Sequence, residues 1–178
     1  MLVITEKSEQ PTAKKEVLVV GRMHPEETVS SYLIEALIKY LLSDGYVPGM
    51  LRKTHCFYIV PMLNPDGVIL GNSRCSASGR DMNRAWASGM QEDINPEVVA
   101  LKRFIAEHRR TLKLVLDFHG HLKKKGCFVY GSHSTQQPYF TRELPFVLNS
   151  IDPDNFSFRD SGFCLGMNKA GSTRKAIW

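Results

Sequence analysis

The sequence contains no C-x-x-C pair and no apolar run long enough to cross a membrane. Its four cysteines, Cys56, Cys75, Cys127 and Cys164, are scattered, which disfavours a disulfide framework. Reduced thiols in a cytosolic protein are the simplest interpretation of this spacing. A membrane-spanning helix needs about 20 consecutive apolar residues, and the apolar patch at residues 1–4 is too short for a signal peptide. We therefore expect a cytoplasmic protein with no membrane partner.

A block of Lys and Arg with interleaved aromatic residues, typical of nucleic-acid binding, is also missing. The one basic run, Lys123–Lys125, is best interpreted as a solvated turn. The net charge of +5 and the pI near 9.1 give a mild basic bias, which suits an acidic peptide as well as a nucleic acid. With 178 residues and 43% hydrophobic content, the chain can form one domain with a real core. We expect no nucleic-acid partner.

Apolar runs and helical periodicities alternate along the chain. They predict strands at 2–5, 17–22, 56–60, from 114 into the segment 117–121, and at 127–130, helices at 26–43, 96–109 and 138–150, and the start of a strand at 175–178. Strands that alternate with helices indicate an α/β fold, with a mixed, mostly parallel sheet and helices on both faces. The segment 62–87 has little periodicity, and so long a loop in a compact domain is usually functional.

The helix at 26–43 has the clearest pattern in the chain. Its apolar residues recur at helical spacing on one face: Val29, Leu33, Ala36, Leu37, Tyr40 and Leu41. Asp44–Gly45 is predicted to end this helix, and Pro48–Gly49 to form a turn. The strand at 56–60 is apolar throughout, which predicts a central strand with both faces covered.

His24 and Glu27 lie three residues apart where the strand at 17–22 meets the helix. Pro25 favours an extended conformation at His24 and pre-sets the first helical residue. The imidazole and the carboxylate can therefore converge at an open sheet edge, which supplies two-thirds of a catalytic zinc site. Alone, H-x-x-E is a weak signal, and a capped helix with an ordinary surface histidine is the alternative.

His119 closes a strand in the same way as His24 does. Ligands collect at the carboxyl ends of strands in open α/β sheets, so two strand-end histidines and Glu27 can form a His₂Glu set. Such a set leaves one coordination position for water. His121 is the competing ligand, but it lies past Gly120, where the strand is expected to be over. Asp117 is either an outer partner of the site or a strand-end cap.

The segment after the strand at 56–60 supplies candidate substrate-binding groups. It opens with a turn signature, Pro61–Gly67. The polar residues that follow are Arg74, Arg80, Asp81, Asn83 and Arg84. The arginines among them are either solvated loop residues or, since they lie close together on a loop that follows a strand end, groups positioned to bind a carboxylate bidentately.

The motifs H-P-E-E, N-P-D-G, R-C-S-A-S-G-R-D-M-N-R-A-W and D-F-H-G-H occur in one order with sensible spacings. On these motifs the chain resembles the zinc metallocarboxypeptidases, and within them the cytosolic carboxypeptidases. The resemblance spans roughly Val17 to Gly131 and continues to Trp178. Members of this subfamily trim C-terminal glutamates, notably from tubulin, so the resemblance implies a protease that acts on acidic protein tails.

The resemblance also implies a role for each matching residue. His24, Glu27 and His119 would bind one Zn²⁺. Asn83 and Arg84 would hold the terminal carboxylate of the substrate. Arg74, in preference to Arg80, would polarise the scissile carbonyl and stabilise the oxyanion. Asp81 would orient His24 and fix its tautomer.

The sequence departs from the family in two places. In the family, a glutamate acts as general base and a tyrosine closes over the substrate, and both residues lie well downstream of D-F-H-G-H. Glu143 is the only glutamate after His119 in this sequence, and it lies in no matching motif. The β-sandwich domain that usually precedes the catalytic domain is also missing. We therefore expect residues 1–178 to be a single catalytic domain, incomplete at its C-terminus. The alternatives are a non-catalytic fragment that binds zinc or acidic tails, and a zinc amidohydrolase of the same fold.

Overall fold

The computed structural model of the chain describes residues 1–7, 13–87, 95–132, 139–163 and 172–173. The chain divides into two compact units. The first comprises Met1–Met82 and Met90–Gly120, and the second comprises Asn83–Gly89 and His121–Trp178.

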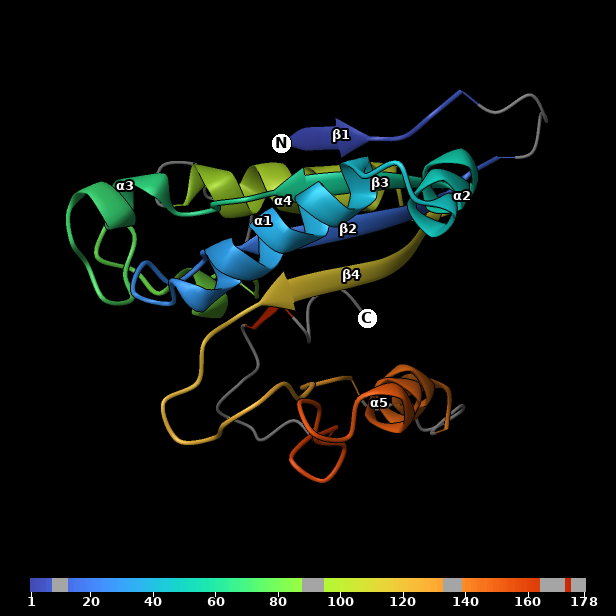
Figure 1. Cartoon of the computed structure of the whole chain (residues 1–178). Helices are drawn as coiled ribbons and strands as arrows, with labels where there is room; N and C mark the ends of the chain where they lie inside the picture. Colours follow the sequence, from blue (N-terminus) through green and yellow to red (C-terminus); the bar gives the residue numbers. More distant parts are fainter. Residues whose placement is uncertain (8–12, 88–94, 133–138, 164–171, 174–178) are drawn as a thin grey trace. The chain divides into compact units, whose positions relative to one another are not determined.

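A four-stranded sheet forms the centre of the first unit (Figure 1). Its strands are β1 (Leu2–Ile4), β2 (Lys15–Gly21), β3 (His55–Val60) and β4 (Leu112–Phe118), in the order β1-β3-β2-β4. Strand β2 pairs in parallel with both β3 and β4, whereas β1 pairs antiparallel with β3. The predicted mixed, mostly parallel sheet is confirmed, and β3 is an interior strand as expected.

Helices cover both faces of this sheet, as predicted. Helices α1 (Val29–Leu42) and α2 (Tyr46–Thr54) pack on one face, and α4 (Pro96–Glu107) lies against the other (Figure 1). At the far end of α4, Glu16 of β2 accepts hydrogen bonds from His108 Nδ1 at 2.7 Å and from Thr111 Oγ1 at 2.6 Å. These bonds fix α4 and the turn after it to the sheet.

The alternation of side chains along β2 divides the core between the two faces. Val17 and Val19 pack with Ile34, Leu41 and other buried residues of the α1 face. Leu18 and Val20, which are equally buried, point to the opposite face. A strand with both faces covered must be apolar along its whole length, and this explains the continuous run at the centre of β2.

The predicted apolar face of α1 is wrong in part. Leu37 and Leu41 contact the core, but Val29, Leu33 and Tyr40 are 46%, 38% and 48% exposed. Ile34 and Ile38, which the prediction omitted, take their places on the buried side. Apolar residues occur almost all round this helix, so packing against the sheet decides which of them are buried.

Two predicted turns are helical in the structure. Pro48–Gly49 lies inside α2, where Pro48 occupies the first turn. Proline is tolerated there because its missing N–H would have no partner within the helix. The N-P-D-G segment forms α3 (Pro65–Ile69), and a 3₁₀ turn at Met82–Arg84 also interrupts the expected loop at 62–87.

The second unit has less regular structure than predicted. The expected helix forms as α5 (Phe140–Ile151). The expected strand at 127–130 is wrong: only isolated bridges form, from Cys127 to Phe156 and from Tyr130 to Gly162. The strand predicted at 175–178 lies outside the described residues. No helix in the described ranges is both long and apolar enough to cross a membrane.

Candidate metal centre

The parallel strands β2 and β4 end at one edge of the sheet, where Gly21 pairs with Phe118. His24 follows β2, and His119 follows β4 directly. Parallel pairing therefore brings two histidines together that are 95 residues apart in the sequence. The prediction that both histidines follow strand ends is confirmed.

A tight turn places Glu27 against His24. Arg22 has the left-handed conformation (φ 54°), which is rare outside glycine and turns the chain sharply after Gly21. Its N–H donates to Ser30 Oγ at 3.0 Å, and Ser30 Oγ donates to the carbonyl of Glu27 at 2.8 Å. The Glu27 N–H donates to the carbonyl of His24 at 3.2 Å. Pro25 and Glu26 thus lie in a turn, and the helix predicted from residue 26 begins at Val29.

The side chains of His24, Glu27 and His119 converge. Glu27 Oε1 lies 2.8 Å from His24 Nδ1, and Glu27 Oε2 lies 2.9 Å from His119 Nδ1. The two Nδ1 atoms are 3.1 Å apart. The Gly120 N–H donates to Glu27 Oε2 at 2.8 Å, which further fixes the carboxylate.

A carboxylate lies behind each imidazole ring. His24 Nε2 is 3.2 Å from Asp81 Oδ1, and His119 Nε2 is 3.0 Å from Asp117 Oδ2. Each ring therefore points Nδ1 at the centre of the group and Nε2 at a carboxylate. Such outer partners hold the tautomer and the orientation of metal-binding histidines. Of the two interpretations of Asp117, the structure favours the outer partner.

The electrostatics of the group favour charged side chains. Burial lowers the pKa of the His119 imidazole, but the carboxylates of Asp117 and Glu27 outweigh it and raise this pKa to about 10. Burial raises the pKa of Glu27, yet the hydrogen bonds with His119 and His24 and the N–H of Gly120 hold it well below its usual range. Glu27 is therefore ionised at neutral pH.

This donor set fits a zinc ion. Within the described ranges, His24, Glu27 and His119 form the group of metal-binding residue types whose ligand atoms all lie within 4.8 Å of one another. Two imidazole nitrogens and one carboxylate are the ligand types of a catalytic zinc site with an open position. His121 belongs to the second unit, where its Nδ1 accepts hydrogen bonds from the N–H groups of Lys123 and Lys124.

Arg74 is connected to this centre through Asp81. Its Nε donates to Asp81 Oδ2 at 2.6 Å, and its side chain is 45% exposed. Burial raises the pKa of Asp81, but hydrogen bonds with His24 and Arg74 and their charges lower it well below its usual range. One ionised carboxylate therefore positions both the His24 ring and an accessible guanidinium. Arg80 is exposed.

Asn83 and Arg84, the predicted carboxylate-binding pair, belong to the second unit. Arg84 Nη1 donates to the backbone carbonyl of Asn83 at 2.9 Å. Asn83 Oδ1 accepts hydrogen bonds from Thr173 N–H at 3.0 Å and Thr173 Oγ1 at 3.2 Å. Sequence reasoning missed Thr173, because no local pattern indicates a partner 90 residues away. The role of the pair stays a prediction.

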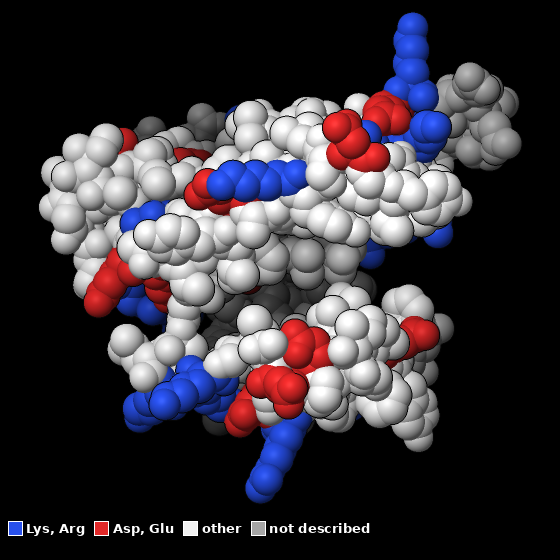
Figure 2. All heavy atoms as spheres, in the orientation of Figure 1, with Lys and Arg blue, Asp and Glu red and all other residues white. Residues whose placement is uncertain are grey.

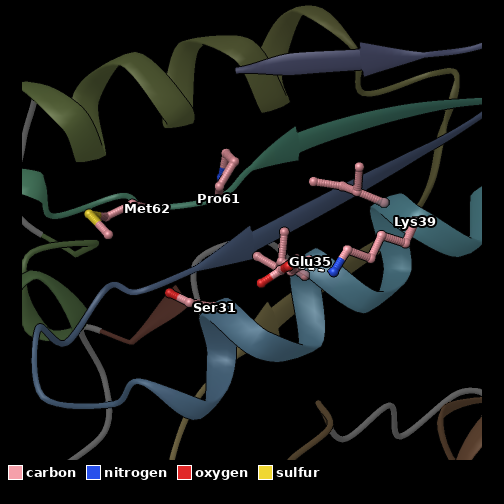
Figure 3. Close-up of a pocket in the computed structure, with 7 residues that line it drawn as sticks. Ser31, Glu35, Lys39, Pro61 and Met62 are labelled. Atoms are coloured by element: carbon pink, nitrogen blue, oxygen red, sulfur yellow. Dashed lines mark ion pairs between the residues drawn. The ribbon is translucent and has the colours of Figure 1, made fainter. Parts of the chain in front are cut away.

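A separate hollow of about 290 Å³ lies between α1 and the segment after β3. Figure 3 shows Ser31, Glu35 and Lys39 on the helix, with Pro61 and Met62 opposite. Glu35 and Lys39 pair at 2.6 Å. The other lining residues are Ile34 and Ile38, so the hollow is mainly apolar and includes none of the three metal-binding candidates.

The chain belongs to the zinc carboxypeptidase family, which matches residues 1–152. Among curated proteins it is similar to cytosolic carboxypeptidase 2 of Mus musculus, with 37% identity over all of this chain and 21% of that protein. Cytosolic carboxypeptidase 2 of Xenopus tropicalis is 39% identical over all of this chain and 19% of that protein. The chain thus spans about a fifth of the length of these relatives. The resemblance to cytosolic carboxypeptidases is confirmed.

Solved structures give the same fold. The metallo-carboxypeptidase from Burkholderia cenocepacia superposes with a TM-score of 0.81 and 25% identity, over 98% of this chain and 47% of that chain. The predicted zinc carboxypeptidase-like fold is therefore confirmed.

Proposed function

We propose that the chain is the zinc-binding part of a metallocarboxypeptidase that removes C-terminal residues from peptides or proteins. The observation that carries the proposal is the convergence of His24, Glu27 and His119, each ring backed by a carboxylate, in a chain of the zinc carboxypeptidase family. These three side chains would hold one Zn²⁺. When bound, the ion would supply Lewis acidity toward a peptide carbonyl and acidify a bound water.

The residues around the ligands have distinct tasks in this proposal. Asp81 and Asp117 keep the two Nδ1 atoms directed at the metal position. Arg74 presents its guanidinium to the carbonyl oxygen of the scissile bond, where negative charge develops. Asn83 and Arg84 bind the terminal carboxylate of the substrate, for which a planar guanidinium offers bidentate hydrogen bonds.

We further propose that the substrates are acidic tails, as in tubulin, that the bond cleaved precedes a C-terminal glutamate, and that the protein is cytoplasmic. Similarity to proteins named cytosolic carboxypeptidases and the net charge of +5 support this choice. In each part of the face drawn in Figure 2, however, acidic side chains occur as well as basic ones. The preference for acidic tails therefore rests on similarity and net charge rather than on a basic patch.

A non-catalytic module that binds zinc or acidic tails is the second candidate. This candidate is favoured because only one glutamate, Glu143, follows His119 in the sequence and could serve as the base. Glu143 lies in the first turn of α5 in the second unit and has no counterpart among the family motifs. A positioned base is needed to take a proton from the attacking water and pass it to the leaving amine. Residues 1–178 as a single, incomplete catalytic domain stay a prediction.

The first experiment is to measure zinc content and glutamate release together. We expect about one Zn²⁺ per chain, most of it lost in His24→Ala and Glu27→Ala and retained in His121→Ala. A peptide ending in several glutamates is then incubated with the zinc-loaded chain, with a longer protein of the family as positive control. Unchanged zinc in both ligand variants would refute the metal site.

Glutamate release separates the two candidate functions. If the chain lacks a positioned base, it should release little or no glutamate, because removing a general base typically costs about 10²- to 10⁴-fold in rate. Robust release that His24→Ala abolishes would instead show that a base is present, and Glu143→Gln would be the variant to test. Zinc-dependent peptide binding without release would identify the binding module.

A further inference from the structure

Asn64 is a fully buried amide that contacts three separate segments of the first unit. Its side chain is 1% exposed. Oδ1 accepts a hydrogen bond from the Gly67 N–H at 3.0 Å, and Nδ2 donates to the carbonyls of Met23 and Cys75, each at 3.2 Å. Met23 immediately precedes His24, and Cys75 immediately follows Arg74. A single carboxamide therefore bonds to the backbone beside a metal-binding candidate and beside the guanidinium that would act on the carbonyl.

The backbone around Asn64 strengthens the same connection. Its N–H donates to the Arg22 carbonyl at 3.2 Å, and the Leu63 N–H donates to the Gly21 carbonyl at 2.9 Å. The backbone of residues 63–64 is thus hydrogen-bonded to the chain at the end of β2, and the Asn64 side chain is hydrogen-bonded to the loop that carries Arg74. Figure 1 shows α3, which begins directly after Asn64, at the sheet edge where β2 and β3 end.

Helix capping alone does not account for this side chain. Asn64 is the N-cap of α3, and its Oδ1 satisfies that role. Asp, Ser or Thr would cap the helix equally well, because a cap needs only an acceptor. The carbonyls of Met23 and Cys75 need two donors in addition, and among small side chains only Asn offers two donors and an acceptor.

The backbone of Gly67 packs closely against the amide and its neighbours. A Cβ added at Gly67 would lie 2.6 Å from Asn64 Oδ1, 2.6 Å from Pro25 Cγ and 2.7 Å from the Cys75 carbonyl oxygen. Gly67 is therefore required for the two segments to approach the amide. A packed junction of this kind transmits displacement of one segment to the other, because protein interiors are close-packed.

We propose that Asn64 is a positioning residue, which sets the place of the His24 turn relative to the loop that carries Arg74 and Asp81. It acts through the backbone and does not touch the metal position. The consequence is local: His24 Nε2 meets Asp81 at 3.2 Å only while both segments keep their separation. This inference rests on the proposed function, in which His24 and Arg74 belong to one site.

The test removes the two hydrogen-bond donors of the Asn64 side chain and keeps the side-chain shape. Asn64→Asp keeps the capping acceptor and removes both donors. Asn72→Asp is the matched control, because Asn72 Nδ2 also donates to the Cys75 carbonyl, at 3.1 Å, but has no hydrogen bond to Met23. Folding is verified by circular dichroism and thermal unfolding. Two readouts then follow: the imidazole nitrogen and proton resonances of His24 in the metal-free chain, and a visible-absorption titration with Co²⁺ as the metal probe.

We expect folded Asn64→Asp to shift the His24 resonances, to change the Co²⁺ absorption spectrum and to bind Co²⁺ about tenfold or more weakly, as for loss of an outer partner of a metal ligand. The Co²⁺ affinity of Asn72→Asp should stay within about twofold of that of the unsubstituted chain. A folded Asn64→Asp with unchanged resonances, spectrum and affinity would overturn the proposal.

Further outcomes also decide the matter. If Asn64→Asp does not fold, Asn64→Ser is measured in the same way, because a hydroxyl caps the helix but cannot bond to both carbonyls. If neither variant folds, Asn64 is required for folding as such, and a specific positioning role is overturned. If the unchanged chain binds no Co²⁺, the proposed zinc site fails, while the His24 resonances still decide whether Asn64 positions that ring.

Discussion

Asp81→Asn should weaken zinc binding by about 10- to 100-fold. Asp81 contacts His24 Nε2 at 3.2 Å and Arg74 Nε at 2.6 Å, and its side chain is 18% exposed. The Arg74 side chain is 45% exposed, so loss of its ion pair with Asp81 costs about 0–1 kcal/mol in the free energy of folding. The His24 contact lies behind a metal-binding candidate, and removing such a partner costs about 1.4–2.7 kcal/mol in metal affinity. The contact with His24 should therefore dominate the loss.

The assay is a competition titration of the metal-free chain against a chromophoric zinc chelator at constant pH. Asp44→Asn provides the control, because it removes the same charge from an exposed turn after α1. We expect the zinc affinity of the control to lie within about twofold of that of the unsubstituted chain. If Asp81→Asn binds zinc as tightly as the control, the carboxylate does not orient His24, and the argument from the paired ring nitrogens fails.

Three further predictions concern packing, protons and the substrate. Gly67→Ala should destabilise the fold by about 1–3 kcal/mol, because its Cβ would lie within 2.7 Å of three other atoms. Gly49→Ala in α2, where the nearest atom is 3.9 Å away, should instead stabilise the fold by up to about 1 kcal/mol. Equal changes in the free energy of unfolding of the two variants, measured by denaturant unfolding, would contradict this reasoning. Because Asp117 and Glu27 outweigh burial and raise the pKa of His119 to about 10, its ring carries a proton at pH 7 that zinc must displace, so affinity should rise as pH rises from 6 to 8. Calorimetry in buffers of different ionisation enthalpy should detect at least one proton released, and no dependence on buffer would contradict this. Arg84→Ala should weaken binding of a peptide with a free C-terminus by about 2–5 kcal/mol if the contact is desolvated, but hardly affect the amidated peptide; equal losses would exclude Arg84 as the carboxylate-binding residue.

The strand ends could be predicted because two signals coincide there. An apolar run without alternation indicates a strand buried on both faces, and a histidine after such a run must lie at the sheet edge. This is why the sequence alone groups His24 with His119. Parallel pairing of β2 with β4, which the sequence indicates only through the alternation of strands and helices, then brings them together.

The phase of α1 could not be predicted in the same way. Val29, Leu33 and Tyr40 form as good a helical stripe as Ile34 and Ile38, and periodicity cannot choose between two apolar stripes. The choice is made by the fit to Val17 and Val19 of β2, which is a tertiary contact. The turn predicted at Pro48–Gly49 is wrong for a related reason, since a dipeptide typical of turns is also compatible with the first turn of a helix.

The polar contacts around the metal centre were the least accessible to sequence reasoning. Asn64 bonds to Met23, 41 residues away, and its motif could be interpreted only as a turn, because a local pattern shows the capping acceptor and not the two donors. The ligands themselves are defined by residue type and by position at a strand end. The groups that aim them are defined by which backbone carbonyls they reach in the folded chain. Substituting a ligand and substituting Asn64 should therefore fail differently: the first removes a donor atom from the metal, and the second leaves every donor atom present but misplaces His24.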